Sequence, residues 1–161
     1  MKKLGFGLMR LPLTDPADPK SIDMPLLMKM ADEFIGHGFT YFDTAYVYHY
    51  GESENAFRKA VAERYPRDSY TIATKLRMLI LKTREQQEAL FEEQLQKCGV
   101  DHFDYYLLHA IDSGMYAVAE KLDSFGFLAE KKKAGKIRYA GFSYHDNAEL
   151  LDEILTKHPE V

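Results

Sequence analysis

The amino-acid sequence predicts an α/β fold in which five β-strands alternate with helices. Apolar runs of the β type recur along the chain, and their starts are 36, 30, 33 and 34 residues apart. That spacing leaves room for one strand, one helix and two short loops. The runs are nearly continuous rather than alternating, as in parallel strands that are covered on both faces. The predicted strands are residues 4–9, 40–45, 70–76, 103–109 and 137–144.

Residues that begin or end helices occur in the first three connections. Pro25 suits the first turn of a helix that Gly36 ends. Thr83 and Gln86 have the spacing of a capping box, and Gly99 ends the helix that follows. The helix between these two turns its small and apolar side chains toward the sheet: Ala56, Phe57, Ala60 and Val61.

The last two connections also predict helices. The fourth is irregular, with helix over 116–122, a break at 124–126 and a second helix over 127–133. The fifth helix begins at Asp146 or Asn147, both of which are good N-caps. Its predicted buried face consists of Leu150, Leu151, Ile154 and Leu155.

Length and composition exclude several classes of protein. The chain has 161 residues and a formal charge of -4, which predicts a single domain over 1–161. The slight acidity provides no basic face for nucleic acid, and no apolar run approaches the roughly 20 residues of a membrane span. The lone Cys98 cannot form an internal disulfide, and the apolar stretch after the first residues is too interrupted for a signal peptide. We therefore expect a cytoplasmic protein.

Two architectures accommodate five βα units: a doubly wound sheet of the flavodoxin type, or the first part of a (β/α)8 barrel. Length alone favours the flavodoxin-like sheet, but the first loop does not. Gly5 and Gly7 begin like a dinucleotide-binding loop, yet Arg10 replaces the third glycine and Pro12 follows, so this fingerprint fails. Strand order separates the two folds, because a barrel arc keeps the order 1-2-3-4-5 and flavodoxin has 2-1-3-4-5.

Polar side chains end three consecutive predicted strands, namely Asp43, Lys75 and His109. Because parallel neighbours end at the same edge of a sheet, these side chains are expected at one rim. An apolar strand tolerates neither charge alone, so Asp43 and Lys75 should form an ion pair. Tyr48 follows Asp43 by five residues and can fold back over the rim. Two other phenols in this loop compete for its role: Tyr46 and Tyr50.

This set of side chains suits protonation of a carbonyl oxygen while a hydride arrives at the carbon. A phenol is a weak acid, and a nearby ammonium makes it a better proton donor. Lys75 is expected to have this effect on Tyr48, while Asp43 keeps Lys75 charged and oriented. His109 can hydrogen-bond the carbonyl oxygen and fix its orientation. The remaining histidines lack the spacing of metal ligands, so no metal site is predicted.

Five strings in order resemble those of the aldo-keto reductases and cover nearly the whole chain. They are LGFGLMRLP at 4–12, GFTYFDTA at 38–45 with Tyr48 after it, TIATK at 71–75, YYLLH at 105–109 and GKIRYAGFS at 135–143. The resemblance implies a (β/α)8 barrel that reduces aldehyde or ketone substrates with NADPH or NADH. It makes Tyr48 the general acid of a tetrad completed by Asp43, Lys75 and His109. It also implies cofactor contacts at Gly7, Met9, Asp43 and Ser143.

The chain departs from the family pattern in ways that affect its expected activity. Tyr144 follows Ser143 where the family commonly has an asparagine that helps to hold the nicotinamide carboxamide. FSYH at 142–145 is similar to a bacterial branch whose longer members end in an iron–sulfur segment, which is missing here. Barrel strands six to eight are missing too. We expect the fragment alone to be inactive and to self-associate through its exposed barrel edges.

Two other classes of function stay open at the level of sequence. One is a non-catalytic binding or regulatory barrel subunit, against which the intact tetrad argues. The other is a flavodoxin-like nucleotide or signalling domain, against which the missing phosphate loop argues.

Overall fold

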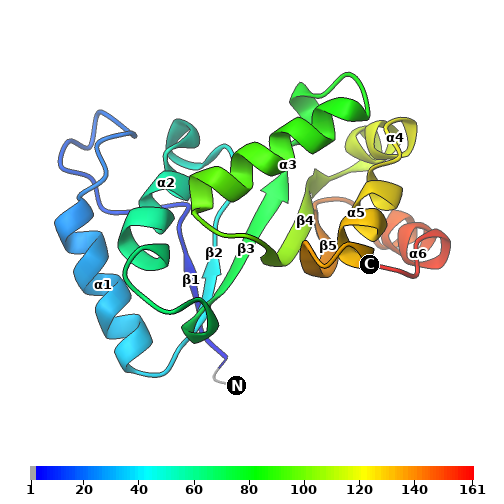
Figure 1. The fold of residues 1–161 in the computed structure, drawn as a ribbon. Helices are drawn as coiled ribbons and strands as arrows, with labels where there is room; N and C mark the ends of the chain where they lie inside the picture. Colours follow the sequence, from blue (N-terminus) through cyan, green and yellow to red (C-terminus); the bar gives the residue numbers. More distant parts are fainter. Residues whose placement is uncertain (1–2) are drawn as a thin grey trace.

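The computed structural model of the protein describes residues 3–161 and contains one sheet of five parallel strands. The strands lie side by side in chain order, β1-β2-β3-β4-β5 (Figure 1). This order confirms the barrel arc and is not the order of a flavodoxin-like sheet. The strands are β1 Gly5–Gly7, β2 Tyr41–Asp43, β3 Thr71–Leu76, β4 Phe103–Ile111 and β5 Ile137–Tyr144.

Helices occupy the connections between these strands, and in Figure 1 they run from α1 at one end of the molecule to α6 at the other. The α-helices are α1 Met24–Gly36, α2 Ser53–Phe57, α3 Glu85–Cys98, α4 Ser113–Lys121, α5 Ser124–Lys133 and α6 Ala148–Lys157. Shorter helical turns cover Tyr48–Gly51, Arg58–Ala62, Arg67–Ser69 and Met78–Ile80. None of the helices in residues 3–161 is both long and apolar enough to span a membrane.

The ends of the helices follow from local chemistry. Asp23 caps α1 by accepting a hydrogen bond from the Leu26 amide at 3.0 Å, and Pro25 lies in the first turn. Gly99 ends α3 in the left-handed conformation, with φ of 69°. The predicted capping box forms only in part. The Gln86 side chain accepts from the backbone amide of Thr83 at 3.4 Å, but α3 begins two residues later than Thr83.

The predicted break in the fourth connection is wrong by two residues. Residues 124–126 belong to α5, and the chain turns instead at Leu122 and Asp123. Asp123 has a φ of 53°, a left-handed conformation that aspartate tolerates better than most side chains. The break was predicted there because of Gly126, but this glycine lies inside α5.

The last helix buries less than its pattern predicts. Ile154 is fully buried, but Leu150 and Leu151 are only half-buried and Leu155 is 47% exposed. The reason is position, since α6 follows β5, the last strand of the sheet in the described residues, and no further unit covers its outer side.

The two faces of the sheet differ in burial. Phe42 and Tyr106 are buried against Phe34 of α1 and Phe91 of α3, with ring centroids 5.1 and 4.9 Å apart. On the opposite, inner face a row of tyrosines runs across the strands and is only half-buried or exposed: Tyr41, Tyr105 and Tyr139. The prediction that both faces are covered is therefore wrong for the inner face, because five strands form an open arc without an opposite wall.

A buried polar cluster ties α2 and α3 to the end of β3. The Gln94 amide nitrogen donates to a carboxylate oxygen of Glu54 at 2.6 Å and to the Lys75 carbonyl at 3.2 Å. Its amide oxygen accepts from the Tyr106 hydroxyl at 2.6 Å, and Thr74 donates to Glu54 at 2.7 Å. Burial raises the pKa of the Glu54 carboxyl. The cluster holds the helix that follows the Tyr48 loop against the strand that carries Lys75.

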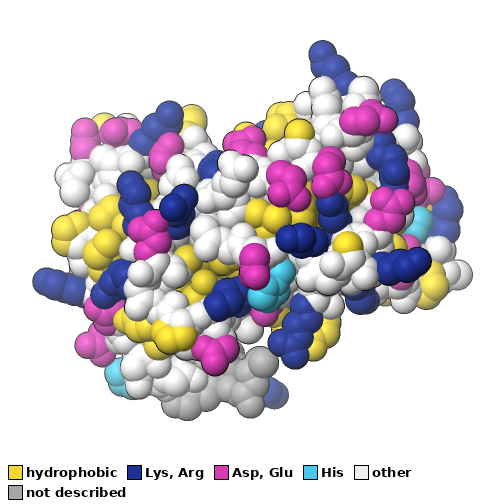
Figure 2. Space-filling view, in the orientation of Figure 1, with side chains coloured by type: hydrophobic (Ala, Val, Ile, Leu, Met, Phe, Trp, Pro, Cys, Tyr) yellow, Lys and Arg dark blue, Asp and Glu magenta, His cyan; other side chains and the backbone are white. Residues whose placement is uncertain are grey.

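The surface carries charges of both signs. On the face shown in Figure 2, Lys and Arg side chains are interspersed with Asp and Glu side chains and form no continuous basic stripe. Apolar side chains appear between them.

Candidate active site

The predicted ion pair between Asp43 and Lys75 is present. The Lys75 ammonium donates to Oδ1 of Asp43 at 2.7 Å and to the Thr44 carbonyl at 2.7 Å. The Lys75 side chain is 6% exposed and the Asp43 side chain is 30% exposed. The ammonium is therefore buried, while the carboxylate is partly accessible at the rim. Tyr41 donates to the other Asp43 oxygen at 3.4 Å, and burial raises the pKa of Tyr41, which keeps it a neutral donor. Asp43 is thus held from both sides.

The loop that carries Tyr48 has an unusual backbone. Tyr48 begins the helical turn Tyr48–Gly51, in which His49 and Tyr50 have φ values of 52° and 53°. Left-handed conformations at two successive residues other than glycine are strained and need outside support. His49 supplies that support, because its Nε2 accepts from the Leu11 amide at 3.0 Å and its Nδ1 donates to the Pro19 carbonyl at 2.8 Å. These two bonds tie the loop to the segment after β1.

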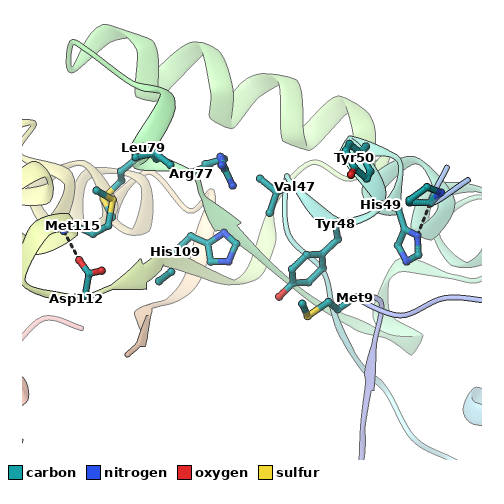
Figure 3. A pocket seen from close by; sticks show the side chains of 13 residues that line it. Met9, Val47, Tyr48, His49, Tyr50, Arg77, Leu79, His109, Asp112 and Met115 are labelled. Atoms are coloured by element: carbon teal, nitrogen blue, oxygen red, sulfur yellow. Dashed lines mark hydrogen bonds between the residues drawn. The ribbon is translucent and has the colours of Figure 1, made fainter. Parts of the chain in front are cut away.

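Tyr48, Lys75 and His109 converge at the carboxyl ends of the strands. The Lys75 ammonium lies 5.1 Å from the centroid of the Tyr48 ring. The rings of Tyr48 and His109 are 6.1 Å apart, edge to face, at 86°. Figure 3 shows both side chains facing the same opening, with the Tyr48 hydroxyl beside Met9. All four residues of the predicted tetrad therefore lie together.

The competing phenols do not share this position. The Tyr46 hydroxyl donates to Glu93 at 3.2 Å, and Lys97 covers its ring at 4.4 Å. Tyr50 is 73% exposed. Of these three phenols, Tyr48 is the one whose ring lies beside the Lys75 ammonium.

Tyr48 and His109 line a cavity of about 620 Å³. Most of its wall is apolar, and polar groups reach it at only a few points (Figure 3). Besides this pair, the lining includes Met9, Val47, Arg77, Leu79, Asp112 and Met115. A mostly apolar cavity with a few convergent polar groups is typical of a small-molecule site.

His109 is uncharged at neutral pH in this environment. Burial, followed by the charges of Lys75 and Arg77, lowers the pKa of His109 from 6.5 to about 4. A neutral imidazole has one donor and one acceptor nitrogen, so it can hydrogen-bond a carbonyl oxygen without bringing a second positive charge into the cavity.

The residues predicted to contact a cofactor lie at the same rim. Met9 lines the cavity and is 55% exposed, and a side chain at Gly7 would meet no atom within 4 Å. The Ser143 hydroxyl accepts from the Ala110 amide at 2.7 Å, which leaves its hydrogen available. Two of the predicted contacts, Asp43 and Ser143, therefore offer an acceptor and a donor toward the open inner face. In the part of the chain that the structure describes, no group of three or more His, Cys, Asp or Glu side chains could hold a metal ion.

Two features of the site are not apparent from the sequence. Ala110 has a φ of 56° at a register shift between β4 and β5, directly after His109. No residue type marks this bulge, since alanine has no preference for that conformation. Arg77 reaches the cavity wall from just beyond β3, and only its distance of two residues from Lys75 could have drawn attention to it.

Comparisons with known proteins agree with this arrangement. Among solved structures, the chain is similar to the thermostable aldo-keto reductase Tm1743 in complex with epalrestat, with a TM-score of 0.76 and 24% identity over 100% of this chain and 56% of that one. It is also similar to aldo-keto reductase AKR11C1 from Bacillus halodurans in its holo form, with a TM-score of 0.72 and 26% identity over 96% and 49%. An aldo/keto reductase from Brucella melitensis gives 0.69 and 20% over 96% and 53%. The chain spans about half the length of these structures.

No curated protein matches the sequence. The sequence model of the aldo/keto reductase family, however, matches residues 3–161, which is nearly the entire chain. The order of the strands, the convergence of the four rim residues and this match lead to one assignment: the chain belongs to the aldo/keto reductase family.

Proposed function

We propose that this chain carries the proton-donating half of an NAD(P)H-dependent oxidoreductase that reduces aldehyde or ketone carbonyls. The observation that carries the proposal is the position of Tyr48, with a paired ammonium 5.1 Å from its ring and a neutral imidazole 6.1 Å away. Family membership supports the same class of reaction.

Each rim residue has a distinct part in the proposed reaction. The Tyr48 hydroxyl donates its proton to the carbonyl oxygen as charge develops there. Lys75 favours the phenolate that remains, and Asp43 holds Lys75 in place through the 2.7 Å ion pair. His109 orients the carbonyl oxygen by a hydrogen bond.

The open inner face fits the nicotinamide end of a cofactor. A bound NADH or NADPH would supply the hydride that the carbonyl carbon accepts. Gly7 and Met9 would leave space for it, while Asp43 and Ser143 would bind its polar groups, consistent with their placement at one rim. The donor set is incomplete for a whole dinucleotide, because the described residues include no glycine-rich phosphate loop.

The test joins this chain to the portion of Tm1743 that it does not cover and follows NADPH oxidation at 340 nm with an aromatic aldehyde. The fusion should turn over, and Tyr48→Phe should lower kcat by at least about a hundredfold, because it removes the proton donor. Tyr46→Phe is the matched control. It removes the hydroxyl of a tyrosine in the same loop, one that donates to Glu93, so this variant should keep most of the activity.

Three outcomes would contradict the proposal. Equal losses in both variants would show that the loop is merely disturbed, and full turnover by Tyr48→Phe would transfer the proton donor to another group. A folded fusion without turnover would favour a non-catalytic role. The chain by itself is expected to be inactive.

We further propose that the chain self-associates through the edges of its sheet. Leu4, Leu26 and Met30 are 54%, 44% and 40% exposed beside β1, and Tyr139 and Leu155 are both 47% exposed toward the β5 end. Edge strands with apolar surroundings favour association. Light scattering should therefore give a mass well above the 18.6 kDa of one chain.

Charged substitutions test which surface is responsible. Leu26→Lys should shift the mass toward the monomer, whereas Leu79→Lys, at a residue 65% exposed on the cavity wall, should not. A monomeric wild-type chain would contradict this proposal.

The single buried thiol, Cys98, fits a reducing compartment such as the cytoplasm.

A further inference from the structure

Arg77 is a half-buried cation that has no partner among residues 3–161. It forms no hydrogen bond, ion pair or ring contact with any described residue. Four other arginines of the described chain, by contrast, form ion pairs with carboxylates: Arg58, Arg64, Arg67 and Arg84. A guanidinium has five N–H donors, and no described protein group accepts from those of Arg77. Arg77 is therefore available to a ligand.

Arg77 stands on the wall of the cavity that holds Tyr48 and His109. Arg77 is the first residue after β3, which ends at Leu76. Figure 3 shows its side chain near that of His109 on the cavity wall. Arg77 and His109 line the same cavity, and the charge of Arg77 is one of the causes that lower the pKa of His109. An anion bound by Arg77 would therefore lie a short distance from the carbonyl site.

The nearby carboxylates do not neutralise Arg77. Asp112 also lines the cavity, but it is exposed, and its Oδ1 accepts from the Met115 amide at 2.7 Å, which caps α4. On its other side Arg77 borders a second cavity, of about 660 Å³, where Glu93 accepts from Tyr46. Neither carboxylate lies within 4 Å of the guanidinium.

Among the positively charged side chains near the proposed reacting position, Arg77 has no carboxylate of the described chain paired with it. Lys75 is balanced by Asp43, and His109 is neutral at pH 7. Several of the other lining residues are apolar, among them Val47, Leu79 and Met115, and apolar neighbours weaken the screening of the guanidinium charge.

We propose that Arg77 binds a carboxylate of the substrate, so that the preferred substrates are aldehydes or ketones that also carry a carboxylate group. This inference rests on the proposed function and deepens it. The planar guanidinium can donate two parallel hydrogen bonds to a carboxylate, which would orient the carbonyl toward Tyr48 as well as add affinity.

Binding to the chain itself tests the proposal without turnover. The probes are 4-carboxybenzaldehyde and 4-formylbenzamide, which have nearly the same shape and differ in charge. Methyl-labelled methionine reports binding through the NMR signals of Met9 and Met115, which line the cavity. The wild-type chain should bind the carboxylate about tenfold more tightly than the amide, and added salt should reduce this preference.

Variants assign the preference to one residue. Arg77→Gln should abolish it and Arg77→Lys should restore part of it, whereas Arg138→Gln should leave it unchanged. Arg138→Gln is a matched control because it removes the same charge at a distant place. Arg138 lies at the start of β5, where its guanidinium stacks on Tyr139.

Three results would overturn the inference: equal affinity for the two probes, no binding of either probe, or a preference that survives Arg77→Gln. These results are separate from the test of Tyr48. Turnover of uncharged aldehydes by the fusion, together with equal affinities here, would leave the proposed function standing and remove the role of Arg77.

Discussion

The uncharged state of His109 makes the stability of this chain depend on pH. In the folded chain the pKa of His109 is about 4, against 6.5 for a free imidazole. Between these two values the unfolded chain binds a proton that the folded chain does not, so the free energy of unfolding falls as the pH falls. Its contribution to stability is fully present above pH 6.5 and is lost progressively toward pH 4.

The size of this loss follows from the shift. Each pH unit below 6.5 would cost about 1.4 kcal/mol for a fully buried group, but His109 is only half-buried, so solvent screening reduces the loss to about 1 kcal/mol at pH 5. The perturbation is His109→Gln, which keeps a side chain able to hydrogen-bond and removes the titration. Relative to this variant, the wild-type chain should lose about 1 kcal/mol of unfolding free energy between pH 7 and pH 5.

Urea unfolding followed by far-ultraviolet circular dichroism, at one chain concentration and a series of pH values, measures this difference. Taking wild type minus variant removes the titration of all other groups. A difference that stays constant between pH 7 and pH 5 would refute the reasoning. The NMR titration of the His109 ring is an independent measurement, and its midpoint should lie near 4.

Three further predictions concern packing and the ion pair. Gln94→Leu should lower the free energy of unfolding by about 3 kcal/mol, because it leaves several buried polar groups unpaired. The control is Gln96→Leu, on the exposed side of the same helix, which should change this free energy by less than about 0.5 kcal/mol. Urea unfolding measures both. A double-mutant cycle of Lys75→Met and Asp43→Asn should give a coupling energy of about 1 to 2 kcal/mol, and additive effects would contradict a stabilising pair. Gly99→Ala should lower Tm by several degrees, since φ is +69° at this position, and an unchanged Tm would contradict the strain.

The tetrad shows why part of the site could be predicted. Asp43, Lys75 and His109 each follow an apolar run, and parallel strands bring their ends together whatever the details of packing. The helix breaks were predicted less well. Asp123 turns the chain because of its backbone conformation, while the glycine that attracted the prediction lies inside α5.

The burial of individual side chains depended on neighbours that sequence patterns do not reveal. Leu155 fits the apolar stripe of α6 but is 47% exposed, because nothing in residues 3–161 packs beyond that helix. Likewise, the continuous apolar strands predicted two covered faces, and the inner face is half-open because the arc does not close.

The sequence by itself determined the number and order of the strands along the chain, most helix ends and the identity of the rim residues, because apolar periodicity, caps and stop residues act over a few neighbouring positions. Only the tertiary structure decided the left-handed backbone of the Tyr48 loop, the bulge at Ala110 and the lack of a partner for Arg77 among the described residues. These features depend on contacts between residues tens of positions apart. Loop conformation, burial and the charge balance of Arg77 are properties of those contacts, so no local pattern in the sequence carries them.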